Sequence, residues 1–121
     1  MANFEIEGKE YELKLNYKAI QYLNKTQEGG SYGLIGKAIQ GDFETFPHIV
    51  HAGLFHTDEK IPLKKVEAEI EKLISEEKLS LEDIMRICDE VVTQSFFYRA
   101  TVQKMIKQNP ELGKALEQLR G

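Results

Sequence analysis

The chain has 121 residues, the size of one domain, and a single cysteine, so no internal disulfide is expected and a reducing interior is favoured. Acidic side chains outnumber basic ones by 20 to 16, a net charge of −4 that argues against a nucleic-acid-binding protein. The N-terminus shows no signal segment, and no apolar run approaches the roughly 18 residues that cross a bilayer. We therefore expect one cytoplasmic domain, residues 1–121, without nucleic-acid or membrane partners.

Residues 3–15 predict a β-hairpin, because apolar and charged residues alternate on both sides of Gly8. A two-residue loop at Gly8-Lys9 would make one face of the hairpin wholly apolar, and glycine at its first position suits a type II′ turn. A loop one residue earlier, at Glu7-Gly8, would place Ile6 opposite Lys9 and mix the two faces. We therefore predict the first register.

The apolar face of this hairpin needs a cover, since a lone hairpin is only marginally stable in water. We expect helices to supply it. The hairpin also offers a free strand edge that could pair between copies of the chain, although charges on its wet face are how proteins keep such edges apart. The residues assigned to this self-association edge are Phe4, Ile6, Tyr11 and Leu13.

Helical periodicity dominates residues 16–108, which predict a bundle of about five helices. The expected helices cover residues 17–25, 32–41, 42–56, 62–78 and 78–109. Asn16 is a good N-cap for the first of them, and Pro47 is tolerated in the first turn of the third, the most buried one. The predicted fold is thus α+β but mainly α, with an N-terminal hairpin packed on a helical bundle.

The C-terminal tail, residues 109–121, predicts one more helix with Asn109 as N-cap and Pro110 at the first position. Charge is unevenly spread: residues 1–95 carry 11 basic and 18 acidic groups, whereas residues 96–121 carry five basic and two acidic groups. This basic bias is read either as a solvated helix surface or as an electrostatic docking site.

No pattern of catalytic or metal-binding residues is found. His48, His51 and His56 lie close in sequence, but a zinc site needs three or four ligands, and Cys88 has no partner cysteine. A thiol on the apolar side of a helix is usually an inert core residue. We therefore expect no catalytic residue, no metal site and no cofactor.

The strongest candidate site is an apolar segment suited to binding another protein. Three consecutive aromatic residues point about 100° apart on a helix, so one internal face cannot easily bury them all. Some of this surface must meet either another chain or the terminal helix folding back, and the sequence leaves both open. The predicted partner-binding residues are Phe96, Phe97, Tyr98, Val102, Met105 and Ile106.

Three segments, in this order, carry a family resemblance. They are "FEIEGKEYELKLNYKAIQYLNK", in which a hairpin runs directly into a helix, then "DFETFPHIVHAGLFH" and "LSLEDIMRICDEVV". The order of these segments over residues 3–95 resembles the tail assembly chaperones of long-tailed phages and prophages. The region from Phe96 onward matches that pattern less clearly.

The resemblance implies a non-catalytic protein of the host cytoplasm that is absent from the mature virion. It implies binding to the long, apolar tape measure protein, help in polymerising tail-tube protein around it, and self-association. A small structural virion protein, such as a head–tail connector or a tail completion protein, is the alternative. A transcriptional regulator is disfavoured by the acidic balance.

Overall fold

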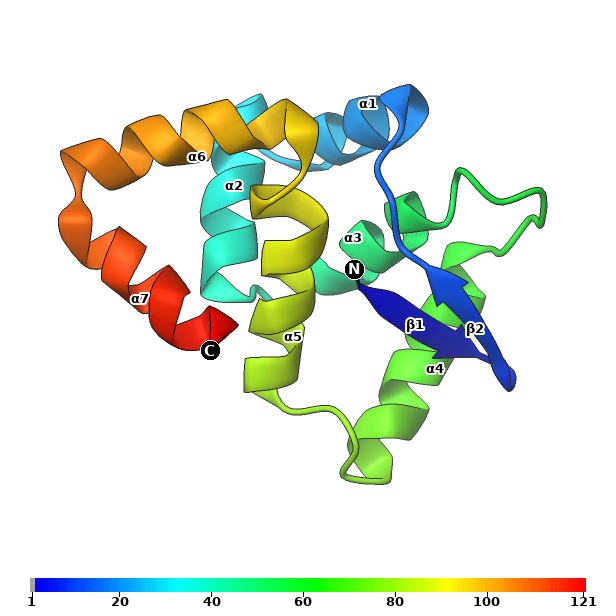
Figure 1. Cartoon of the computed structure of the whole chain (residues 1–121). Coiled ribbons are helices and arrows are strands. Elements are labelled where there is room, and N and C mark those ends of the chain that lie inside the picture. Colours follow the sequence, from blue (N-terminus) through cyan, green and yellow to red (C-terminus); the bar gives the residue numbers. More distant parts are fainter. Residues whose placement is uncertain (1) are drawn as a thin grey trace.

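The computed structural model describes residues 2–121, and in this range it contains seven α-helices, one π-helical turn and a two-stranded antiparallel hairpin (Figure 1). The bounds are β1 Asn3–Ile6, β2 Lys9–Glu12, α1 Tyr17–Thr26, α2 Gly30–Gln40, α3 Phe46–Gly53, α4 Leu63–Ser75, α5 Leu81–Cys88, the π turn Asp89–Thr93, α6 Phe96–Gln108 and α7 Pro110–Arg120. The predicted class, mainly helical with an N-terminal hairpin, is confirmed, but the expected number of about five helices is wrong.

The extra helices arise chiefly because the predicted long helix over 78–109 is divided. α5 passes into the π turn, and the chain bends at Ser95, whose backbone is extended, with φ −66° and ψ 150°. The hydroxyl of Thr93 donates to the carbonyl of Asp89, and that of Ser95 donates to the carbonyl of Val92. Such local side-chain bonds compete with the helical ladder, so a continuous apolar pattern does not guarantee a continuous helix.

The hairpin has the register that the sequence analysis rejected. Phe4 pairs with Tyr11 and Ile6 pairs with Lys9, so Glu7-Gly8 is the two-residue loop. Glu7 and Gly8 both have positive φ, 50° and 84°, which is the type I′ conformation. A type I′ turn matches the twist of the strands it connects, and this geometry outweighs the apolar match between the faces.

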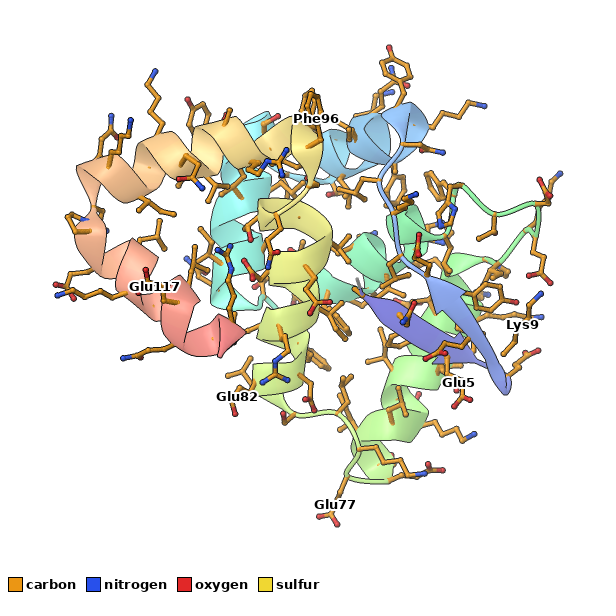
Figure 2. The ribbon with its side chains drawn as sticks, in the orientation of Figure 1. Glu5, Lys9, Glu77, Glu82, Phe96 and Glu117 are labelled. Carbon is orange, nitrogen blue, oxygen red and sulfur yellow. The ribbon has the colours of Figure 1, made fainter. Side chains whose placement is uncertain are left out.

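The mixed face is tolerated because Lys9 lies at the tip of the hairpin, outside the core (Figure 2). Its ammonium bonds to Glu59 at 3.0 Å and lies 5.2 Å from the ring centroid of Tyr11. In this register Glu5 faces Glu10 on the exposed side. Packing beneath the hairpin, and not cross-strand pairing alone, therefore determines which side chains of the hairpin are buried.

Helix α3 is the centre of the core, and the hairpin covers it. Phe4 packs edge-to-face on Phe46 with ring centroids 6.3 Å apart. The backbone N–H of Lys14 donates to the carbonyl of Gly53 at 3.0 Å, which ties the end of β2 to the end of α3. The buried residues of α3 are Phe46, Ile49, Val50, Ala52 and Gly53. As expected, helices supply the cover that the hairpin needs.

An ion pair between a buried carboxylate and a partly exposed arginine joins the π turn to the last turn of α7. Asp89 is only 2% exposed, and Arg120 of α7 donates to its two carboxylate oxygens at 2.8 and 2.9 Å. Gln94 donates to it at 2.6 Å, and the Thr93 hydroxyl also donates to it. Burial would raise the pKa of the Asp89 carboxyl, but the bonds from Arg120, Thr93 and Gln94 together hold that pKa below its usual value.

Replacing Glu7 by asparagine should stabilise the protein by about 0.5–1 kcal/mol, because asparagine adopts a positive φ more readily than glutamate. Urea unfolding followed by circular dichroism measures this. Glu7→Gln is the matched control, since it also removes the charge that lies 3.5 Å from Lys65. A Glu7→Asn protein no more stable than Glu7→Gln would contradict the type I′ turn.

Replacing Arg120 by glutamine should lower the free energy of unfolding by about 1–3 kcal/mol, because Asp89 loses its charged partner. Arg86→Gln is the control: Arg86 pairs with Asp83 at 3.4 Å on the surface, and its loss should change stability by less than about 0.5 kcal/mol. Equal effects of the two substitutions in urea unfolding would show that the Asp89–Arg120 pair has no special role.

Candidate protein-binding surface

The six predicted partner-binding residues of α6 divide into three groups. Tyr98 and Val102 are buried in the core, so they are not available to a partner in this structure. Met105 and Ile106 are half-buried against α7. Phe96 and Phe97 are exposed, by 88% and 54% respectively, and Figure 2 shows Phe96 standing out from the start of α6. A partner-binding role for this segment stays a prediction, and the exposed part of it is Phe96 and Phe97.

The division follows from helical geometry. Tyr98 and Val102 are four residues apart and share the inner face of α6, whereas Phe96 and Phe97 fall on other faces. The hydroxyl of Tyr98 donates to the side-chain carbonyl of Asn24 in α1 at 2.9 Å. Burial raises the pKa of Tyr98 to about 12, so it remains a neutral hydrogen-bond donor. Tyr98 thus fixes α6 on the bundle and leaves its two neighbours outside.

Helix α7 folds back over the far half of α6. Its Gly113 approaches Ile106 so closely that a Cβ atom on that glycine would lie 2.8 Å from Ile106 Cγ2. Of the two coverings that the sequence left open, the terminal helix therefore accounts for Met105 and Ile106. It does not cover the start of α6.

Helix α1 adds residues to the exposed surface that the sequence analysis did not single out. Tyr17 is 74% exposed and, with Ile20, borders the same surface depression as Phe96 and Phe97, about 480 Å³ in volume. We call Tyr17, Phe96 and Phe97 the aromatic patch. Tyr17 is two residues before buried Ala19, about 200° around the helix, and this offset is the sequence signal that marks it as outward-facing.

The side chains of the residues predicted for the self-association edge do not point outward. Phe4, Ile6 and Leu13 are buried and Tyr11 is half-buried, so these side chains pack inward. In the described part of the chain β1 has a strand on one side only. The other strand is better covered, since His56 Nε2 lies 2.7 Å from the carbonyl oxygen of Glu12. A self-association role for this edge stays a prediction.

His48 and His51 pack around one residue, Tyr22, and Cys88 is buried in α5. His48 Nδ1 is 2.6 Å from the Tyr22 hydroxyl, and the ring of His51 packs edge-to-face on Tyr22. Burial lowers the pKa of His51, and neighbouring His48 lowers it further. Over residues 2–121, no group of three or more His, Cys, Asp or Glu side chains is placed to hold a metal ion.

No helix within residues 2–121 is both long enough and apolar enough to cross a bilayer.

Exposed contiguous apolar patches and aromatic residues are features of protein–protein interfaces. The family described as "Phage tail assembly chaperone protein, TAC" matches residues 3–107, from β1 to nearly the end of α6. The chain therefore belongs to the phage tail assembly chaperone family, and the suspected resemblance is confirmed. No curated protein and no solved structure matches it.

Cys88 should be unreactive in the folded protein, because burial raises the pKa of its thiol to about 12 and excludes reagents. Titration with Ellman's reagent should detect no thiol in native buffer and one per chain in denaturant. Asp89, the partner of Arg120, directly follows Cys88 in sequence, so the Arg120→Gln protein provides a useful comparison. Rapid stoichiometric labelling of the native protein would contradict the buried position.

Proposed function

We propose that this chain is a tail assembly chaperone that binds the tape measure protein and assists the polymerisation of tail-tube protein around it. It acts without catalysis, in the host cytoplasm, and leaves before the virion is complete. Membership of the chaperone family supports this proposal at the level of tail assembly. The observation that carries the binding role is the aromatic patch on α1 and α6.

The aromatic patch has the composition of a binding site. Large contiguous exposed apolar patches are uncommon on monomeric proteins, and aromatic residues are enriched where interfaces gain most of their binding energy. An amphipathic helix of a partner can place its apolar residues against such a surface at helical spacing. A tape measure protein with long apolar helical segments provides that kind of surface many times along its length.

The charge distribution supports a chaperone that stays dispersed while it exposes apolar surface. Arg99 borders a shallow depression beside Phe96 and Phe97, and residues 96–121 carry a basic excess. The rest of the chain is acidic, so separate copies repel one another over most of their surface. This arrangement favours contact through the patch and limits unspecific aggregation.

Self-association is the second part of the proposal. A long partner offers room for many copies of a chain this small, and the outer edge of β1 could pair with another copy. The negative charge of Glu5 on that strand opposes pairing of free chains. Self-association would therefore depend on the partner bringing copies together.

Replacing Phe96 or Phe97 by aspartate should reduce co-purification with the tape measure protein at least tenfold, because a charge replaces an exposed apolar anchor. Both positions are exposed, so the variants should fold normally by circular dichroism. Leu81→Asp is the matched control: Leu81 is 61% exposed at the start of α5 and lies outside the patch.

Normal binding by both variants would show that the aromatic patch is not the binding surface. Detection of the chain in purified virions by mass spectrometry would instead favour the alternative, a small head–tail connector or tail completion protein. A tape measure gene beside the gene for this chain would support the chaperone.

A further inference from the structure

We propose that α7 is a built-in occupant of a helix-binding groove formed by α5, the π turn and α6, and that a partner helix displaces it. The partner helix carries two leucine-like residues four positions apart and an arginine four positions further along. This inference rests on the proposed function, because it supposes a helical client protein. It concerns a surface separate from the aromatic patch.

Helix α7 shows what the groove accepts. Leu112 and Leu116 are four residues apart, and Arg120 follows after another four, so all three lie along one face of α7. Leu116 is only 3% exposed and Leu112 is half-buried. Two apolar contacts and one basic side chain thus define the docked face.

The groove also limits the size of the docked helix's side chain at one position. Gly113 follows the first leucine and lies directly against Ile106, where an added Cβ would come within 2.8 Å of Cγ2. Glycine inside a helix costs about 1 kcal/mol relative to alanine, so its presence fits a close approach of the two helices. A partner helix must have a small residue at this position as well.

Asp89 gives the groove its preference for a basic occupant. Thr93 and Gln94 donate hydrogen bonds to its carboxylate, and Arg120 of α7 donates to it as well. A buried carboxylate that loses its charged partner is strongly unfavourable, so an occupant without a basic residue binds poorly. The pair therefore selects the chemistry of the occupant, whether it is α7 or a partner helix.

The attachment of α7 suits displacement. α7 spans Pro110–Arg120, only 11 residues, and isolated helices of that length are marginal in water. Its N-cap Asn109 makes no side-chain capping bond, and this single residue separates α7 from α6 (Figure 1). The family match ends at residue 107, so the groove residues Asp89, Met105 and Ile106 lie inside the matched part and α7 lies outside it.

The test uses the full-length chain and a fluorescent peptide with the sequence of residues 109–121, "NPELGKALEQLRG", followed by anisotropy. Gly113→Leu should release α7, because leucine cannot fit against Ile106, and the freed groove should bind the peptide at least tenfold more tightly than the unmodified chain. Ala115→Leu is the matched control: Ala115 is exposed on the same helix, so this variant should bind like the unmodified chain. Arg120→Ala is a second way to loosen α7 and should also raise binding.

The peptide itself provides the chemical test. A peptide carrying Arg120→Gln should bind the Gly113→Leu chain at least tenfold more weakly, because it cannot pair with Asp89. Equal binding of the two peptides would overturn the proposal. So would a failure of both Gly113→Leu and Arg120→Ala to bind the peptide more tightly than the unmodified chain. If the released chain instead forms dimers by light scattering and excludes the peptide, the occupant is a second copy and the partner-helix proposal is wrong.

The outcome of this peptide test does not depend on whether the chain binds the tape measure protein. Phe97→Asp changes the aromatic patch and should leave peptide binding unaltered, whereas Gly113→Leu tests the groove without any tape measure protein. A failure of one surface can therefore be distinguished from a failure of the other.

Discussion

The ion pair between Asp89 and Arg120 sets the arrangement of the C-terminal third of the molecule. A carboxylate that is 2% exposed needs several donors, and the π turn brings Thr93 and Gln94 within reach of it. The remaining donor comes from the last turn of α7, 31 residues later in the chain. The buried carboxylate of Asp89 therefore ties the π turn after α5 to the last turn of α7.

Much of the fold could be predicted from sequence, because helical periodicity and caps are local signals. Asn16 does cap α1, with its side-chain oxygen 2.9 Å from the N–H of Ala19, and Ser80 forms a capping box with Asp83 at the start of α5. The hairpin exists, but its register depends on the turn geometry at Glu7-Gly8, which the apolar pattern does not encode. The bend at Ser95 was missed because the apolar spacing continues through it.

The candidate surface was predicted less completely, since burial depends on contacts between distant segments. The run of aromatic residues at 96–98 correctly indicated that one internal face could not bury them all. Which of them is buried depends on Asn24, a partner 74 residues earlier that receives the Tyr98 hydroxyl. Tyr17 joins the patch only because the start of α6 lies beside α1, and no local pattern encodes that proximity.

Both ends of the described chain are held in place, which has a consequence for handling the protein. The carbonyl of Ala2 accepts a bond from Leu13, and Arg120 reaches Asp89. A fusion tag at either terminus would be attached within two residues of one of these contacts. The loop at Glu77 between α4 and α5 is exposed and stands away from both (Figure 2). An epitope inserted there would not be attached to the hairpin, the aromatic patch or the last helix.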